Sequence, residues 1–195
     1  MKFKNGKKID MKNKFKIIQL IGKNLTPEPI DFMIQERIRE YGVHKKFDFK
    51  NWENESEFFF LKEDETIKAF GMLKPVTLYA DDKNYQIMGI ANILAVEKGK
   101  WYGTILINVI KVYLEKNSYV GLGSTHSNNF KFYEDCGFTF LPKFIEKIVY
   151  IDENWIENYR DSKDWDHEMF IFDKENQLKN LITSGKKSTV KIPFW

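Results

Sequence analysis

Residues 93–105 read ILAVEKGKWYGTI, and within them the pattern of apolar side chains changes from that of a buried strand to that of a helix. Upstream, the apolar run YQIMGIANILAV at 85–96 predicts a long strand. Downstream, apolar residues recur at helical spacing from Tyr102 to Leu114, which predicts an amphipathic helix ending near Asn117. The glycine-containing turn between them would present free backbone N–H groups at the positive end of the helix dipole, a seat for a diphosphate. Lys98 and Lys100 add positive charge there, although the turn also fits a purely structural role.

The segments on either side predict one mixed α/β domain. Helices are expected at 27–41, 102–117 and 128–136, and strands at 15–21, 58–61, 67–73, 85–96, 119–122, 138–140 and 145–151. Pro75 is expected to limit the strand at 67–73 or to mark a sheet edge. This order of elements predicts a mixed sheet with helices on both faces.

Charge and length divide the chain into three parts. Residues 1–14 are a basic leader, because residues 1–16 carry seven lysines and one acid, and 15–151 form the domain. Residues 152–195 are an extension packed on the same domain, where it covers the sheet or shapes the substrate side. In that extension the apolar run 169–172 fits a strand or a buried turn of helix, and 173–184 fits a helix.

Composition excludes several classes of protein. A single cysteine, Cys136, allows no internal disulfide or cysteine-based metal cluster and indicates a reducing, cytoplasmic setting. No apolar run approaches the roughly 20 residues that cross a bilayer, so no membrane span is expected. Three scattered histidines lack metal-ligand spacing, so no metal is expected.

A second motif, FYEDCGF at 132–138, follows the turn with one strand between them. Together the two segments resemble the GNAT acyltransferase superfamily, whose turn carries Arg or Gln, two residues, Gly, one residue, then Gly or Ala. Lys100, Gly103 and Ile105 take these positions in one register, and Trp101 and Gly103 take the two glycine positions in another. A branched residue at position 105 would crowd a ligand that approaches the backbone.

The resemblance implies a twisted, mostly antiparallel sheet of about six to seven strands and acetyl-CoA as cosubstrate. It places the cleft between parallel strands ending at Val96 and Gly121, with Leu94 and Val96 pairing with the pantetheine arm. The Val96 N–H would stabilise the oxyanion, and Tyr133 would protonate the leaving thiolate. Asn128 and Asn129 would contact the pantetheine arm or cap their helix. The diphosphate would bind the N–H groups of Lys98, Gly99, Lys100, Trp101, Tyr102, Gly103 and Thr104.

Three functions remain open. The first is an acyl-CoA-dependent N-acetyltransferase acting on an unidentified small-molecule or protein amine, for which the acidic stretch 152–168 favours a cationic acceptor. The second is a non-catalytic acyl-CoA-binding domain, because no strong general base is evident beyond His126 or Glu134. The third, which lysines without stacking aromatics support poorly, is nucleic-acid binding through the leader. Tyr133 also fits a core role, Cys136 fits a small buried residue, and the sequence does not indicate an oligomeric state.

Overall fold

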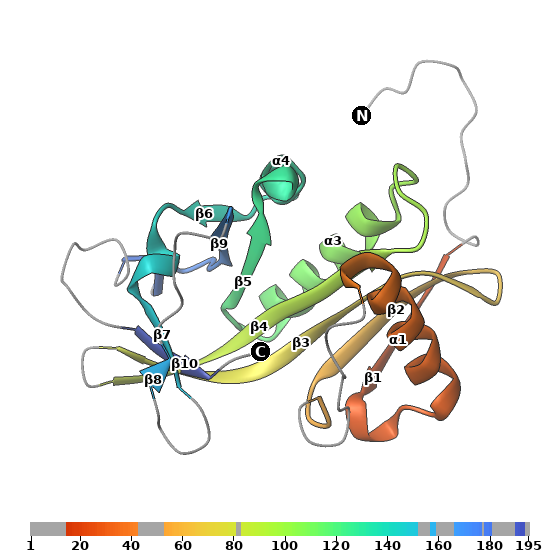
Figure 1. Cartoon of the computed structure of the whole chain (residues 1–195), viewed down its shortest axis with the longest axis horizontal. Helices are drawn as coiled ribbons and strands as arrows, with labels where there is room; N and C mark the ends of the chain where they lie inside the picture. Colours follow the sequence, from red (N-terminus) through yellow and green to blue (C-terminus); the bar gives the residue numbers. More distant parts are fainter. Residues whose placement is uncertain are drawn as a thin grey trace.

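The computed structural model describes residues 15–42, 53–80, 83–151, 157–158, 166–176, 178–180 and 190–193. Helices lie on both sides of a twisted sheet (Figure 1). Short 3-10 turns at Gly22–Asn24, Ser127–Asn129 and Phe144–Lys147 complete the connections. In chain order the elements are β1 (Phe15–Ile21), α1 (Pro27–Tyr41), β2 (Glu57–Glu63), β3 (Thr66–Ala80), β4 (Lys83–Ala95), α3 (Tyr102–Lys116), β5 (Gly121–His126), α4 (Phe130–Asp135), β6 (Thr139–Leu141), β7 (Ile148–Ile151), β8 (Glu157–Asn158), β9 (His167–Phe172) and β10 (Val190–Pro193).

The sheet follows the order β6-β9-β5-β4-β3-β10-β7-β8, with β2 beside β3 and β1 beside β2. Neighbouring strands are antiparallel except for the pairs β4–β5 and β7–β10, which are parallel. The predicted mixed, mostly antiparallel sheet with helices on both faces is therefore confirmed. The sheet has more strands than predicted, because β8, β9 and β10 from the C-terminal extension join it.

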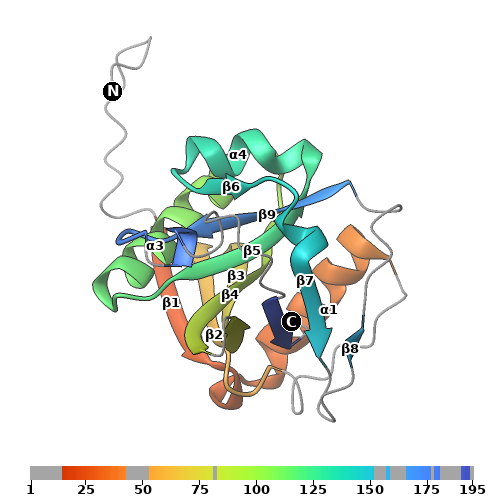
Figure 2. The same ribbon diagram turned by 90° about the vertical axis from the view of Figure 1, so that its left-hand side faces the viewer.

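The aromatic run of β2 supplies the cores on both faces of the sheet, since successive strand side chains point to opposite sides. Phe58 and Phe60 pack with Met33 of α1. Phe59 and Leu61 instead belong to the cluster that contains the buried side chains of α3. Helices α1 and α3 therefore cover opposite faces of the same strands, as Figures 1 and 2 show.

Two predictions about strands left alternatives open, and the structure decides between them. Strand β3 runs through Pro75 to Ala80 instead of ending before the proline. On one edge of β3, pairing with β2 stops at Leu73 and pairing with β10 occurs at Tyr79. Pro75 lies between these two stretches, so its missing N–H removes no hydrogen bond to a neighbouring strand on that edge. The ambiguous run 169–172 is part of β9, which lies between β5 and β6.

Some predicted segments lie outside the described residues. These are the basic leader 1–14, most of the acidic stretch 152–168, and the part of the expected helix 173–184 after residue 180. Within the described ranges, no helix combines the length and apolar character needed to cross a membrane.

Candidate functional site

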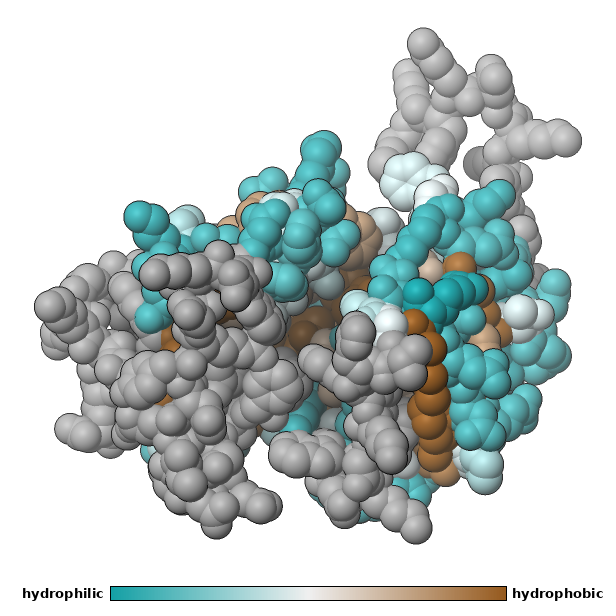
Figure 3. Space-filling view, in the orientation of Figure 1, coloured by the Kyte–Doolittle hydropathy of each residue, from teal (hydrophilic) through white to brown (hydrophobic). Residues whose placement is uncertain are grey.

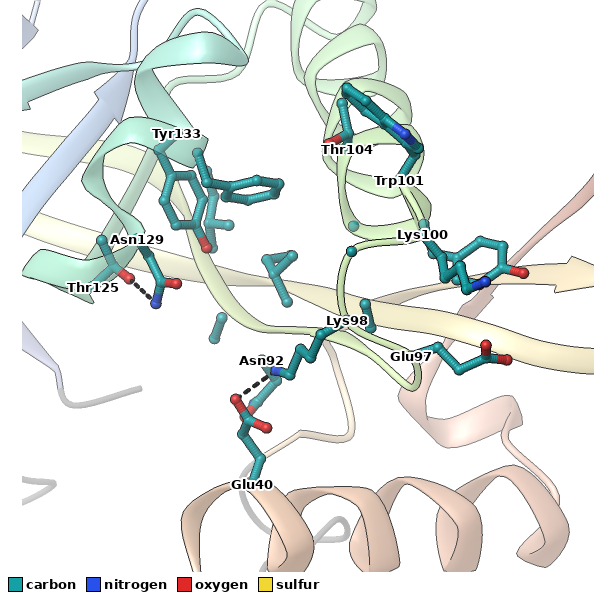
Figure 4. A pocket seen from close by; sticks show the side chains of 18 of the residues that line it. Glu40, Asn92, Glu97, Lys98, Lys100, Trp101, Thr104, Thr125, Asn129 and Tyr133 are labelled. Atoms are coloured by element: carbon teal, nitrogen blue, oxygen red, sulfur yellow. Dashed lines mark hydrogen bonds and ion pairs between the residues drawn. The ribbon is translucent and has the colours of Figure 1, made fainter.

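A cavity of about 450 Å³ opens where β4 and β5 separate (Figures 3 and 4). The two strands pair in parallel only over Met88–Ile90 and Gly121–Gly123, yet β4 continues to Ala95 and β5 to His126. The cleft was predicted beside a strand ending at Gly121, but β5 begins there and its later residues line the cavity. The small residues of GLGSTH have weak strand propensity, so the sequence predicted this strand at 119–122 and missed its continuation to His126.

A β-bulge bends β4 beside the cavity. Two residues of β4, Asn92 and Ile93, lie opposite Gly71 of β3. Asn92 has a φ of 54°, in the left-handed region that asparagine tolerates better than most residues. A Cβ on Gly71 would lie 2.5 Å from Ile93 Cδ1, so a larger residue there would force the Ile93 side chain to shift. Asn92 and Ile93 both line the cavity.

Helix α3 begins at the cavity wall. Its first intrahelical hydrogen bond runs from the Ile105 N–H to the Trp101 carbonyl, 2.9 Å, so the amides of residues 102–104 start the helix without an intrahelical acceptor. The Trp101 side chain is 68% exposed, and its indole lies along α3 rather than across the cavity (Figure 4). Ile105 packs against the core. Gly99, with a φ of 75°, has open space where a Cβ would lie, so neither large residue plugs the turn.

Charges of both signs surround the turn. Lys98 Nζ lies 2.7 Å from Glu40 Oε1 at the end of α1. Glu97 pairs with Lys68 of β3 at 3.3 Å. Among the residues that the structure describes, no carboxylate pairs with Lys100. The predicted lysines are therefore at the turn, but one of the two is already neutralised.

The N–H of Val96 is not available to a ligand. Its N–H donates to the Lys68 carbonyl at 2.9 Å, and its carbonyl accepts a hydrogen bond from Arg39 Nη2 at 2.9 Å. The prediction that the Val96 N–H stabilises an oxyanion is therefore wrong in this arrangement. The amide belongs to the β3–β4 ladder instead.

The neighbouring residue faces the cavity. In an antiparallel pair, hydrogen-bonded and non-hydrogen-bonded positions alternate. Val96 bonds to β3, so Ala95, opposite Ala69, directs its N–H and carbonyl to the other edge of β4, where the strands separate. Leu94, two residues from Val96, faces β3 in the same way, and its side chain is 3% exposed. Ala95 lines the cavity and was missed, since an apolar run does not reveal which amides face which neighbour.

Tyr133 of α4 is the predicted catalytic residue that does reach the cavity. Its ring stacks on Phe170 with centroids 3.9 Å apart, and the residue is 7% exposed. Its hydroxyl points toward the cavity in Figure 4. Burial raises the pKa of this hydroxyl well above its ordinary value, so it stays protonated at neutral pH.

The two asparagines differ in position. Asn129 Nδ2 donates to Thr125 Oγ1 at 3.2 Å, and Asn129 lines the cavity. Its side chain makes no helix-capping bond, contrary to the capping alternative. Asn128 is exposed, is not among the lining residues, and donates its N–H to His126 Nδ1 at 3.3 Å.

His126 is poorly placed to act as a general base. Because Nδ1 accepts the amide proton of Asn128, the neutral ring carries its own proton on Nε2. That nitrogen lies 3.5 Å from the Asp166 carboxylate. Both ring nitrogens are therefore engaged. Glu134, the other candidate, is exposed and lies outside the cavity lining.

Two further side chains have structural roles. Tyr102 donates its hydroxyl to Glu63 Oε2 at 2.8 Å, which ties the start of α3 to the β2–β3 hairpin and raises the pKa of Tyr102 to about 12. Cys136 is 3% exposed, and burial raises its thiol pKa. Across the described ranges, no group of three or more His, Cys, Asp or Glu side chains is arranged to hold a metal ion.

No protein-family model matches the sequence, and no curated protein is detectably similar to it in sequence. Solved structures are similar in fold. An acyl-CoA N-acyltransferase from Pseudomonas aeruginosa superimposes with a TM-score of 0.55 at 12% identity, over 80% of this chain and 98% of that one. An N-acetyltransferase from Staphylococcus aureus gives 0.52 at 18% identity, over 82% and 97%. N-acetylglutamate synthase from Neisseria gonorrhoeae, solved with coenzyme A and L-arginine, gives 0.52 at 15% identity, over 81% of this chain and 32% of its own.

Proposed function

We propose that this chain, which has the fold of the GNAT N-acetyltransferases, transfers an acetyl group from acetyl-CoA to an amine by direct attack in a ternary complex. The observation that carries the proposal is the cavity between the separated ends of β4 and β5, with the first amides of α3 on its wall. The fold alone would not justify it, because one fold can host unrelated functions.

The residues of the turn fit a diphosphate. Amides at a helix start bind phosphate oxygens because they lack intrahelical acceptors and lie at the positive end of the helix dipole. Gly99 leaves its side of the turn open, and Lys100 offers a positive charge that no described carboxylate neutralises. The pantetheine arm of coenzyme A would then extend along the free edge of β4, where Ala95 presents its backbone groups.

When bound, acetyl-CoA would supply a thioester, whose carbonyl carbon forms the new C–N bond as the C–S bond breaks and the thiolate of coenzyme A leaves. The chain must stabilise the negative charge on the carbonyl oxygen and the leaving thiolate. The Ala95 N–H is the donor we assign to the oxyanion, because it faces the cavity while the N–H of Val96 does not. The nitrogen of the amine loses its proton to water or to a base supplied by the substrate.

Tyr133 is the group we assign to the thiolate. An ordinary thiol has a pKa of about 8.5, and burial moves the pKa of Tyr133 further above that value. Complete proton transfer to the sulfur is therefore uphill. A hydrogen bond from the Tyr133 hydroxyl still stabilises the developing negative charge, so we expect it to act as a donor that retains its proton.

A non-catalytic acyl-CoA-binding domain is the second candidate. It is favoured because the side chains that could act as a general base already have partners. The two acids lining the cavity, Glu40 and Glu97, are each paired with a lysine, and both nitrogens of His126 are engaged. This candidate requires the same cavity and the same diphosphate seat, so only turnover separates it from the enzyme.

Two measurements test these proposals in sequence. Acetyl-CoA at about 100 times its dissociation constant should stabilise the protein by roughly 2.7 kcal/mol, seen as a higher melting temperature. No shift at millimolar acetyl-CoA would reject both candidates. If it binds, thiol release in the presence of a panel of amines distinguishes the enzyme from the binding domain. Tyr133→Phe should then leave binding intact and slow release, and unchanged turnover would remove Tyr133 from the mechanism.

A further inference from the structure

An ion pair joins two walls of the cavity. Lys98 comes from the turn between β4 and α3, and Glu40 comes from the last turn of α1 (Figure 4). Their charged atoms are 2.7 Å apart, and both residues line the cavity. The side chains are 66% and 35% exposed, so neither is locked in place by burial.

The position of Lys98 exposes this pair to competition. A diphosphate on the amides of residues 102–104 would bring more than one negative charge to the turn that carries Lys98. An exposed ion pair contributes little to stability, because water screens it and ordering two long side chains costs entropy. A multiply charged diphosphate would therefore draw Lys98 away from a single carboxylate.

The ion pair of the other acid in the cavity would not compete with a diphosphate. Glu97 pairs with Lys68, which lies on β3 and not on the turn. A ligand seated at the start of α3 would leave that pair in place. Among the described lining residues, Glu40 is therefore the carboxylate whose partner lies where the diphosphate would bind.

We propose that the Lys98–Glu40 pair is a switch operated by coenzyme A: the diphosphate takes Lys98, and the released Glu40 carboxylate binds the ammonium group of a cationic amine acceptor. This inference rests on the proposed function and adds the substrate class and a coupling between the two ligands. Tyr41, beside Glu40 on the cavity wall, adds an aromatic ring, and a carboxylate with an aromatic face is a favourable surround for an alkylammonium.

The first test measures coenzyme A binding by isothermal titration calorimetry. Glu40→Gln frees Lys98 beforehand, so it should tighten binding about two- to fivefold more than Glu97→Gln does. Glu97→Gln is the matched control, because it removes the same charge from the same cavity and leaves Lys98 paired. In a Lys98→Met background the two substitutions should have equal effects. Equal effects when Lys98 is present would overturn the switch.

The second test titrates 1,4-diaminobutane, a simple dication, with and without saturating coenzyme A. The diamine should bind at least about tenfold more tightly to the loaded protein, and by linkage it should tighten coenzyme A by the same factor. The coupling should disappear in Glu40→Gln, which lacks the carboxylate, and in Lys98→Met, where the carboxylate is already free. A coupling that survives in Glu40→Gln would report only the charge of coenzyme A and refute the assignment. If the unchanged protein binds no coenzyme A, the proposed function fails with the switch; if it binds but neither effect appears, the switch alone fails.

Discussion

Thr104→Asp distinguishes a diphosphate-binding site from a purely structural helix start, because the new carboxylate should stabilise the helix but weaken the binding of a diphosphate. Residue 104 is the third of α3 and lines the cavity. A carboxylate in the first turn of a helix stabilises it by about 0.3–1 kcal/mol. The same carboxylate would repel a diphosphate. Two unit charges 4 Å apart repel by about 1 kcal/mol in water and about 4 kcal/mol at an effective dielectric constant of 20, so coenzyme A should bind roughly fivefold to almost a thousandfold more weakly.

The control for this substitution is Val112→Asp. Val112 is 46% exposed on the same helix, and eight residues of helix separate it from Thr104 by about 12 Å, beyond the screening length of about 8 Å at physiological salt. Calorimetry with coenzyme A and urea unfolding should show weaker binding but equal or greater stability for Thr104→Asp, and near-normal binding for Val112→Asp. Tight binding of coenzyme A by Thr104→Asp would refute the seat at this helix start.

Three further substitutions or reagents probe the frame around the site. Gly71→Ala should lower the free energy of unfolding by about 1–3 kcal/mol, since its Cβ would lie 2.5 Å from Ile93 Cδ1; an unchanged urea midpoint would show that the bulge relaxes freely. Glu53→Gln removes the carboxylate that lies 3.0 Å from the fully buried Arg37, and should lower the free energy of unfolding by about 3–5 kcal/mol. The double variant Glu53→Gln with Arg37→Met should lose less stability, because no buried charge remains. Equal losses in the single and double variants would contradict this reasoning. Cys136 should react with a disulfide reagent far more slowly in the folded than in the unfolded protein, because burial hides the thiol and raises its pKa. The reaction of the folded protein should therefore accelerate only at a pH above the ordinary thiol pKa of about 8.5. Equal rates in the folded and unfolded protein would refute the burial.

Local signals predicted the helices well. Pro27 at the first position of α1 and Gly42 after its last residue bound that helix as expected, and Gly42 takes a φ of 80° that glycine favours. The apolar stripe of α3 likewise marked a helix beginning at Tyr102. These features depend on residues within a few positions of one another, which a sequence displays directly.

Long-range pairing was harder to predict. Nothing in the run MFIF shows that β9 inserts between β5 and β6, because the partners of Met169 lie at least 28 residues away in the chain, at Leu141 and Ser124. Likewise, Glu40 shows no sequence relation to Lys98, 58 positions later, although their pair shapes the cavity. Such contacts are fixed by the order of the strands and by the place where α1 packs on the sheet.

The register of β4 shows why the position of the turn before α3 could be predicted while the amide facing the cavity was assigned to the wrong residue. A strand exposes its amides to alternate edges, so an error of one residue exchanges every donor that faces the cavity with one that faces the neighbouring strand. The bulge at Asn92 and Ile93 inserts one residue into β4 just before this point, and it therefore changes which amides beyond it face β3. The structure assigns Val96 to the ladder and Ala95 to the cavity. Side chains of alanine and valine carry no sign of that assignment, which is why the amide that faces the cavity could be identified only after the bulge was seen.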